Sequence, residues 1–522
     1  MDHVDVLLVG YEEGENLGMR YIAAYLERQG VSCEIVNYDM SVKNRVLRAA
    51  VEMKPNIIGF SLIFQRMLPD FAELIALLRS RGIECHFTMG GHFPSANPHA
   101  ILTAIPGLDS VVIGEGEYTT LELWREINDK NDWRHIPGIA FRKGGEVVLS
   151  EPRPLIPELD ELPFPKRKET VDTHRGLGIG TLLGSRGCYY NCSFCSVRKF
   201  YQTSPGALRR SRSPANVVAE MCQMYDNQGI RIFIFEDDDF LAKNRQQRAW
   251  VGSFLDELRD TPLYGNILWR MSCRIDDMDF ELLARMKEAG LTFVYTGIES
   301  GNEQGLRTCN KHYGVQDVFA GLDVLRELSL PYEFGFMILN PDSTLQSVKE
   351  DIAFLKQVNE DKNALVQFTK MMPYAGTPIA QRLKQEHRLE GSVEAPDYEF
   401  NDPRVRWLQE FFSLAFHQRN FDRLGFVELA RYTKLDVMAV RTFFSGEYDG
   451  ESYWADFREL IYRGNAVCLE KASMAVNFMM RLTEDQIMEY WGFLEQLARQ
   501  EKEEELRICD ELMNLMRCHG FS

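Results

Sequence analysis

The stretch Arg186-Gly187-Cys188-Tyr189-Tyr190-Asn191-Cys192-Ser193-Phe194-Cys195 spaces three cysteines as C-x3-C-x2-C. Three thiolates this close together can bind one compact metal centre. A structural zinc site closes with four protein ligands, and iron–sulfur clusters usually take four cysteines. Three cysteines leave one corner of the metal centre for a ligand that is not protein. The stretch therefore predicts a centre at which chemistry can occur.

A zinc site is the alternative interpretation of the three cysteines. Cys222 or His174 could supply the fourth ligand, since cytosolic cysteines at short spacings often bind zinc. A second C-x2-C pair or an H-x3-5-H pair would favour zinc, and the sequence near the motif has neither. The motif therefore favours an iron–sulfur centre.

The composition is that of a soluble globular protein with two or three domains. The chain has 522 residues, of which 45% are hydrophobic and 26% are charged. A net charge of −18 argues against a nucleic-acid surface. A basic run still follows the cysteines, and it predicts either a solvated face or a contact with an anionic substrate: Arg198, Lys199, Arg209, Arg210 and Arg212.

The sequence predicts a cytoplasmic protein. Its start, Met-Asp-His-Val-Asp, lacks the basic and apolar regions of a signal peptide. No stretch of about 18 uncharged apolar residues predicts a membrane span. A reducing compartment also suits an oxygen-sensitive cluster.

The first 125 residues alternate short apolar runs with amphipathic segments, which is typical of a parallel sheet with crossover helices. The predicted strands are Val4–Val9, Cys33–Asn37, Ile57–Phe60, Cys85–Met89 and Ser110–Ile113. A helix is predicted over Leu17–Arg28, with Asn16 as its N-cap and Gly30 after its end.

Ligands of open parallel sheets bind outside the carboxyl ends of the strands. Glycines recur there, either because backbone approaches a large ligand closely or because the strand-to-helix turns are tight. The predicted strand ends are Gly10–Gly14, Ser61–Phe64, Gly90–His92 and Gly114–Glu117.

A proline-rich segment over 151–165 predicts an extended linker. Six further apolar runs then predict a partial (β/α) barrel, and the pattern becomes helical after about residue 395. The barrel runs are Thr181–Ser185, Ile232–Glu236, Ile267–Ser272, Phe293–Gly297, Tyr332–Leu339 and Leu365–Lys370.

Polar residues fall at the carboxyl ends of the predicted barrel strands, where barrel enzymes hold their reactive groups. Four acids, Glu236–Asp239, follow the second strand and indicate a solvated turn, a cation site or acceptors for an amine. Arg274 follows the third and could pair with a carboxylate. Glu299 follows the fourth, where it is either a ligand of hydroxyl groups or an ordinary acid at a helix N-terminus.

The cysteine motif, with Arg186-Gly187 before it, and the order of strand ends in both halves resemble the cobalamin-dependent radical S-adenosylmethionine (SAM) enzymes. The resemblance implies an α/β fold in four parts. A Rossmann-like cobalamin-binding domain spans 1–145, a linker 146–175, a partial (β/α)6 radical SAM barrel 176–390 and a helical domain 391–522.

The same resemblance implies the site residues. The ligands of a [4Fe–4S] cluster are Cys188, Cys192 and Cys195. The residues for SAM are Phe194, Glu236, Asp237, Arg274 and Glu299. The residues for cobalamin are Glu12, Ser61, Leu62, Gly90, Gly91, Gly114, Glu115 and Gly116.

The D-x-H-x-x-G motif that supplies a histidine below cobalt in many cobalamin proteins is missing. We therefore expect base-off cobalamin with its lower face on Ser61–Phe64, and His92 as a wall residue.

The implied activity is methyl transfer to an unactivated carbon of a small-molecule substrate, such as a natural-product or cofactor precursor. An electron donor such as flavodoxin or ferredoxin is the expected partner. Cyclisation or rearrangement with the same cofactors is the alternative. A non-catalytic corrinoid or metal-binding sensor is a further alternative, and a zinc-stabilised scaffold comes last.

Overall fold

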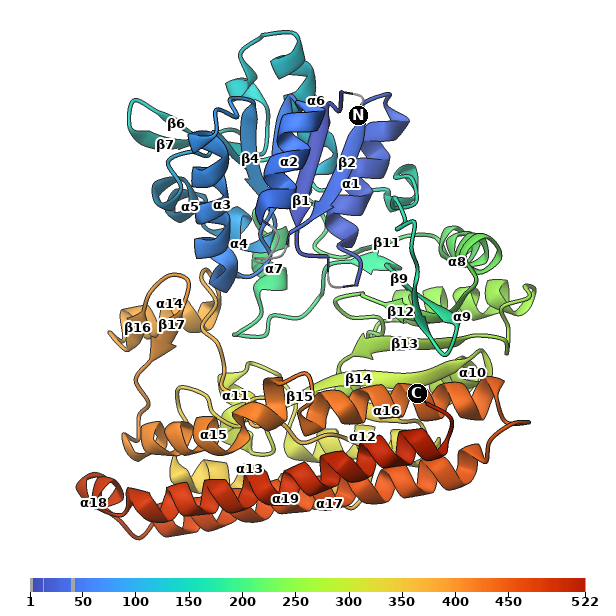
Figure 1. Ribbon diagram of the computed structural model, residues 1–522, viewed down its shortest axis with the longest axis vertical. Coiled ribbons are helices and arrows are strands. Elements are labelled where there is room, and N and C mark those ends of the chain that lie inside the picture. Colours follow the sequence, from blue (N-terminus) through green and yellow to red (C-terminus); the bar gives the residue numbers. More distant parts are fainter. Residues whose placement is uncertain (1–2, 13, 39–42, 522) are drawn as a thin grey trace. The chain divides into compact units, whose positions relative to one another are not determined.

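A computed structural model of the chain describes residues 3–12, 14–38 and 43–521. The chain forms two compact units, drawn in Figure 1. Unit 1 consists of Met1–Asp172, Gly180–Glu220 and Pro373–Asp397. Unit 2 consists of Thr173–Ile179, Met221–Met372 and Tyr398–Ser522.

Unit 1 contains a seven-stranded sheet in the order β2-β1-β3-β4-β5-β6-β7. Its first five strands are parallel, and β6 and β7 add to it antiparallel. The strands are β1 (Val6–Gly10), β2 (Cys33–Asn37), β3 (Ile57–Ser61), β4 (His86–Gly90), β5 (Ser110–Val112), β6 (Ile139–Lys143) and β7 (Glu146–Leu149). The five predicted strands are confirmed, and the sheet continues past the boundary predicted at residue 145.

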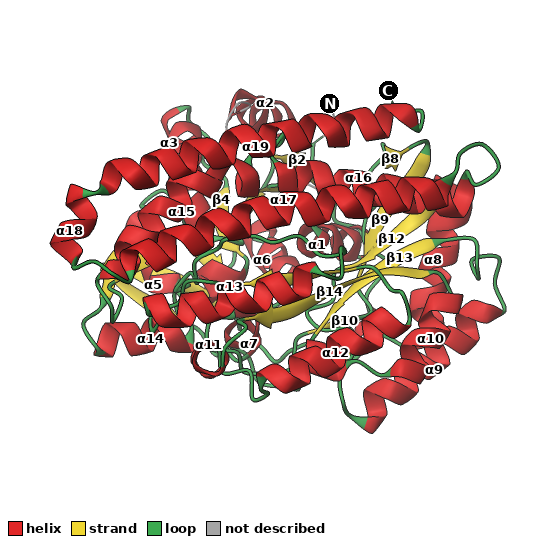
Figure 2. Cartoon of the chain, turned by 90° about the horizontal axis from the view of Figure 1, so that it is seen from below, coloured by secondary structure: helices red, strands yellow, loops and turns green. Residues whose placement is uncertain are grey.

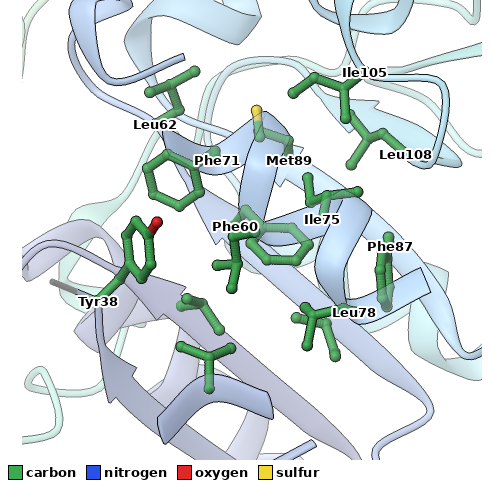
Figure 3. Close-up of a cluster of buried hydrophobic side chains, with 14 of the residues drawn as sticks. Tyr38, Phe60, Leu62, Phe71, Ile75, Leu78, Phe87, Met89, Ile105 and Leu108 are labelled. Carbon is green, nitrogen blue, oxygen red and sulfur yellow. The ribbon is translucent and has the colours of Figure 1, made fainter. Parts of the chain in front are cut away.

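Helices cover both faces of this sheet because apolar side chains point to both sides of its strands. Val6 and Leu8 pack with α1 (Leu17–Arg28) and α6 (Glu117–Asn128). Leu7 and Val9 pack on the other face, with α2 (Lys43–Met53), α3 (Leu68–Ser80) and α5 (Pro98–Ala104). Figure 3 shows this second core, which is rich in aromatic rings.

Helix α1 has the predicted bounds. The Asn16 side chain accepts a hydrogen bond from the backbone N–H of Met19, so the predicted N-cap is confirmed. Gly30 follows the helix with a φ of +79°, as expected of a glycine just past a helix end.

Unit 2 is built on a sheet whose order is β15-β14-β13-β12-β9-β8. Strands β12 to β15 are parallel, and helices connect them, as in a half-barrel. The strands are β8 (Asp172–His174), β9 (Leu177–Leu182), β12 (Ile230–Phe235), β13 (Leu268–Cys273), β14 (Leu291–Glu299) and β15 (Tyr332–Phe336). The connecting helices are α9 (Arg245–Arg259), α10 (Phe280–Glu288), α11 (Glu303–Thr308) and α12 (Val315–Glu327), and α13 (Leu345–Asn359) follows β15.

The predicted α/β class with a partial barrel is confirmed. The sixth predicted barrel strand, Leu365–Lys370, is reduced to one parallel bridge, between Leu339 and Lys370. The segment has little pairing because Leu365 packs instead against the C-terminal helices.

The C-terminal part of unit 2 is helical, as predicted. Its helices are α15 (Arg404–Phe421), α16 (Phe426–Phe443), α17 (Gly450–Met479), α18 (Glu484–Glu489) and α19 (Trp491–Cys518). The long helices α17 and α19 run side by side (Figure 2). Within the described residues, none of the helices has the length and apolar character needed to cross a bilayer.

Candidate cofactor site

The segment that carries the three cysteines is a loop of unit 1 closed at its base by a short antiparallel ladder. Strand β10 (Ser185–Arg186) pairs with β11 (Arg210–Ser211), and Arg186 lies opposite Arg210. Like charges opposite each other destabilise a ladder unless they are neutralised. The loop base therefore requires nearby acids.

Glu115 and Glu117 supply those acids. Arg186 contacts Glu115 at 2.9 Å and Glu117 at 2.6 Å, and Arg210 contacts the second oxygen of Glu115 at 2.7 Å. The backbone N–H of Ile156 also donates to Glu115, at 2.8 Å. Burial opposes ionisation of Glu115, but Arg186 and Arg210 outweigh it and hold its pKa below the ordinary value. The acids after β5 therefore anchor the base of the cysteine loop.

Only glycine fits at position 187, at the start of the loop. Its φ is +88°, and a Cβ there would lie 1.7 Å from the carbonyl oxygen of Leu208. The chain can therefore turn away from the ladder into the cysteine motif only with a glycine at this position.

A second contact fixes the loop to the end of β4. Helix α7 (Ser196–Tyr201) follows Cys195, and its Phe200 ring stacks on His92 with centroids 4.3 Å apart. His92 begins α4 (His92–Ala96), directly after Gly91, where a Cβ would lie 2.4 Å from the carbonyl oxygen of Leu62. Burial lowers the pKa of His92 to about 4, so the ring is neutral. His92 is thus a packing residue, and its predicted role as a wall of the cobalamin site remains a prediction.

The three cysteines are reduced and partly exposed. The backbone N–H of Tyr190 points to the sulfur of Cys188 at 3.5 Å, and the N–H of Cys195 donates to the carbonyl of Cys192. Three thiols on one tight loop, one of them already accepting a backbone N–H, fit an iron–sulfur cluster, whose sulfurs are commonly hydrogen-bonded. Within the described ranges, no three His, Cys, Asp or Glu side chains converge on a single metal ion.

The zinc alternative named His174 as a fourth ligand. In unit 2, His174 contacts Asp436 at 2.8 Å and stacks on Phe521. Its side chain is therefore engaged in the core of that unit.

Just past the end of β1, the predicted cobalamin residue Glu12 holds the segment that leads into helix α1. Its carboxylate accepts from the backbone N–H of Asn16 and pairs with Arg20, and it is 7% exposed. Asn16 also donates to the Ser61 hydroxyl at 3.4 Å. The strand order reverses between β1 and β3, where α/β proteins form a ligand crevice, so Asn16 spans the edge of that crevice.

The segment after β3 divides between core and surface. Leu62 lies in the core, fully buried, as Figure 3 shows. Ile63 and Phe64 are 40% and 47% exposed. Leu62 can therefore meet a cofactor only through its backbone, whereas Ile63 and Phe64 present apolar side chains.

The remaining predicted cobalamin glycines surround the same edge. Gly90 ends β4. Gly114 donates its N–H to the Ser95 hydroxyl at 3.0 Å, and Gly116 precedes α6 as its N-cap.

Among the predicted SAM residues, Glu299 stands at the end of β14 in unit 2. Its φ is +71°, which is uncommon for a residue other than glycine, and the register of β14 with β15 shifts beside it. Gly297 and Gly335 face each other in that register, and a Cβ on either would lie within 3.4 Å of a Glu299 carboxylate oxygen. The carboxylate therefore occupies a recess that the two glycines leave open, where it pairs with the buried Lys311 at 3.2 Å. Backbone strain of this kind concentrates at functional sites.

The guanidinium of Arg274 already binds a carboxylate. Its Nε and Nη2 atoms donate to Asp276 at 2.9 and 3.3 Å, and Nη2 donates to the carbonyl oxygen of Lys311. The bidentate contact predicted with the SAM carboxylate would require Arg274 to exchange Asp276 for the ligand. That role stays a prediction.

The acids after β12 differ in exposure. Glu236 is about half exposed and approaches Arg270 at 3.3 Å, whereas Asp237 is 4% exposed. Phe194, the last predicted SAM residue, is half-buried in the cysteine loop of unit 1.

Asp351 on α13 holds the turn after Glu299. Its carboxylate accepts from the Ser300 hydroxyl at 2.9 Å and from the N–H of Gly301 at 2.6 Å. Burial raises its pKa to about 7. Nothing in the local sequence of α13 indicated this contact.

The structure shows two features of the site that the sequence did not predict. The basic run after the cysteines is not a solvated face throughout, since Arg210 and Arg212 are buried in ion pairs. The second feature is that the acids after β5, which were expected only at a strand end, contact the base of the cysteine loop. In the sequence, these acids were marked by their spacing alone, Glu-x-Glu beside two glycines.

Two family models match the chain. The model for the B12 binding domain matches residues 4–123, and the model for the radical SAM superfamily matches residues 182–355.

Curated relatives of both reaction types are similar to the chain. An uncharacterized methyltransferase of Pyrococcus horikoshii is 28% identical over 70% of this chain and 78% of its own length. An anaerobic magnesium-protoporphyrin IX monomethyl ester cyclase of Cereibacter sphaeroides is 26% identical over 59% of this chain and 49% of its own length.

Two solved structures share the fold. The cobalamin-dependent SAM radical enzyme OxsB, with aqua-cobalamin bound, aligns with a TM-score of 0.70 at 17% identity and covers 99% of this chain and 81% of its own. The methyltransferase TsrM of Kitasatospora setae, with cobalamin and a [4Fe–4S] cluster bound, aligns with a TM-score of 0.66 at 16% identity and covers 91% of this chain and all of its own.

Proposed function

Because the chain belongs to the cobalamin-dependent radical SAM enzymes, we propose that it transfers a methyl group to an unactivated carbon of a small-molecule substrate, such as a natural-product or cofactor precursor. One observation carries the proposal. Within unit 1, the cysteine loop is anchored on the carboxyl edge of the sheet in the B12 binding domain, through Glu115 and through the stack of His92 on Phe200. This supports a methyl carrier and a radical initiator working on one substrate.

We propose that Cys188, Cys192 and Cys195 bind three irons of a [4Fe–4S] cluster and leave the fourth iron for SAM. When bound, the cluster supplies the electron that opens SAM and cobalamin carries the methyl group. The chain's own task is placement. The ladder of β10 and β11, neutralised by Glu115 and Glu117, holds the loop in one position.

We propose Glu299, Glu236, Asp237, Arg274 and Phe194 for SAM, and Ser61 with the exposed side chains of Ile63 and Phe64 for the lower face of cobalamin. An apolar lower face is consistent with base-off cobalamin. A flavodoxin- or ferredoxin-type protein would reduce the cluster.

The test uses SAM with a deuterated methyl group and the substrate. We expect 5′-deoxyadenosine and S-adenosylhomocysteine in about equal amounts, because each turnover uses SAM once for each purpose. The label should appear on a product carbon. Alanine at all three cysteine positions should abolish both products, whereas Cys222→Ala, on the same chain but outside the motif, should leave them unchanged.

The cyclase relative favours a second candidate, cyclisation or rearrangement without methyl transfer. In that case 5′-deoxyadenosine forms without S-adenosylhomocysteine, and the product gains no deuterium. This result would contradict the methyltransferase proposal.

A further inference from the structure

The half-barrel of unit 2 contains a cavity of about 310 Å³, partly open to solvent, on the face of the sheet that packs with α16. Apolar side chains from strands and helix form most of its wall, among them Ile232, Leu268, Phe293, Leu435 and Met438. Protein interiors are close-packed, with few voids larger than a water molecule. A cavity of this size is in the range that holds small ligands.

The cavity lies along the amino-terminal half of β13 and β14 and along the middle of β12. Ile232 and Ile234 line it, and Asp237 at the carboxyl edge of the same chain segment is three to five residues further on. On β12 the cavity reaches Ile234, one residue before the strand ends at Phe235. Arg270 in its wall contacts Glu236, just past that strand end, at 3.3 Å, so a ligand that reaches Arg270 approaches the carboxyl edge.

Among the described residues, one acid lines the cavity, and each of its carboxylate oxygens accepts a hydrogen bond. Glu333 on β15 is 5% exposed, and its two oxygens accept from Lys434 and from Arg431, each at 3.0 Å. Lys434 in turn donates to two backbone carbonyls as well as to Glu333. Lys434 has thus used its three N–H donors, and both oxygens of Glu333 are already paired with cations.

The Thr292 hydroxyl in the wall donates to the carbonyl oxygen of Trp269 at 3.3 Å, and the other polar groups available at the cavity are donors. Arg431 uses Nε on Glu333 and Nη1 on the half-exposed Glu428, and its Nη2 makes no hydrogen bond to any described residue. Within the part of the chain that the structure describes, the Arg270 guanidinium makes one hydrogen bond, a long one from Nη2 to Glu236 at 3.3 Å. Burial raises the pKa of Tyr295 to about 12, so its hydroxyl keeps a proton, and no described residue accepts it.

We propose that this cavity binds a part of the substrate that combines an apolar body with an anionic oxygen group, a carboxylate or a phosphate. Arg431 and Arg270 donate charged hydrogen bonds to the anion, and the Tyr295 hydroxyl adds a neutral donor. A wall with two guanidinium groups and a phenol favours a ligand group that accepts hydrogen bonds, and guanidinium groups suit oxyanions. The inference rests on the proposed function for its claim that the ligand is the substrate. The cavity's preference for an apolar anion stands on the lining residues alone.

The test measures binding by the full chain without cofactors, so it does not depend on methyl transfer. The probe is 8-anilinonaphthalene-1-sulfonate, an apolar anion, and N-phenyl-1-naphthylamine is its uncharged counterpart. Arg431→Met should weaken binding of the anionic probe about tenfold or more, the size expected for a lost charge-assisted hydrogen bond, and leave the neutral probe unchanged. Arg431→Lys should recover part of the affinity.

Arg441→Met is the matched control, since Arg441 lies on the same helix, pairs with the exposed Glu451 and does not line the cavity. Ile234→Trp, which fills the cavity, should remove both probes. Circular dichroism checks that each variant is folded. Competition by decanoate, decyl phosphate and decanol identifies the group: the carboxylate or the phosphate should displace the anionic probe better than the alcohol.

Equal binding of the anionic probe by Arg431→Met and Arg441→Met would overturn the proposal. So would binding of both probes by Ile234→Trp. Displacement of the anionic probe by decanol as effectively as by decanoate and decyl phosphate would overturn it as well. Failure of the deuterium-transfer test with these binding results intact would reject the proposed reaction and leave the anion preference standing.

Discussion

Replacing Glu115 by glutamine should loosen the base of the cysteine loop. The carboxylate of Glu115 joins Arg186 and Arg210 on the two strands of the ladder and also accepts from Ile156. All these groups are buried, and removing one partner of a buried ion pair costs about 3–5 kcal/mol because it leaves an uncompensated charge. At 1.36 kcal/mol for each factor of ten, the loop base should open at least about a hundredfold more often.

Hydrogen–deuterium exchange of peptides spanning residues 184–212 measures this opening. Glu122→Gln is the control, since Glu122 lies on the same helix as Glu117 and pairs with Arg153 while its own side chain is 41% exposed. Loss of a pair at the surface costs at most about 1 kcal/mol, or roughly fivefold in exchange. If exchange in these peptides rises no more in Glu115→Gln than in Glu122→Gln, the acids after β5 do not anchor the loop.

Three further predictions concern other residues of the site. Gly187→Ala should abolish iron binding on anaerobic reconstitution, because the added Cβ would collide with the carbonyl oxygen of Leu208. Gly144→Ala is the control: residue 144 also has a positive φ but open space around it, so this variant should bind iron normally. Burial lowers the pKa of His92 from 6.5 to about 4, so the free energy of unfolding is unaffected by this group above pH 6.5 and falls by about 3 kcal/mol as the pH drops toward 4. In denaturant titrations His92→Phe should therefore lose less stability than the parent over that range, and equal losses would contradict a ring that is held neutral in the fold. Glu299→Gln should weaken SAM binding in equilibrium dialysis because it removes the carboxylate that we propose for SAM, while the exposed Glu327→Gln should not. Unchanged binding in both variants would remove Glu299 from the SAM site.

Much of the fold followed from patterns that are local in the chain. Helix α1 and its cap at Asn16 depend on residues within one turn of each other, so the sequence predicted them at their observed bounds. The parallel strands of unit 1 were predicted for a similar reason, since strands buried on both faces are continuous apolar runs. The predicted strand Leu365–Lys370 has the same apolar character but forms a single bridge. Leu365 packs instead on helices more than 60 residues further along the chain.

By itself, the sequence determined which chemistry the chain can support, because the spacing of Cys188, Cys192 and Cys195 is a property of ten consecutive residues. Tertiary structure alone decided what surrounds them. Arg186 and Arg210 meet Glu115 across 71 and 95 residues of chain, and no local period records such a pairing. Likewise, Leu62, just past β3, joins Ile58 and Phe60 in one core and donates its N–H to the carbonyl oxygen of Gly90, whereas the next residue, Ile63, is 40% exposed. Both are apolar, so the sequence alone does not distinguish them.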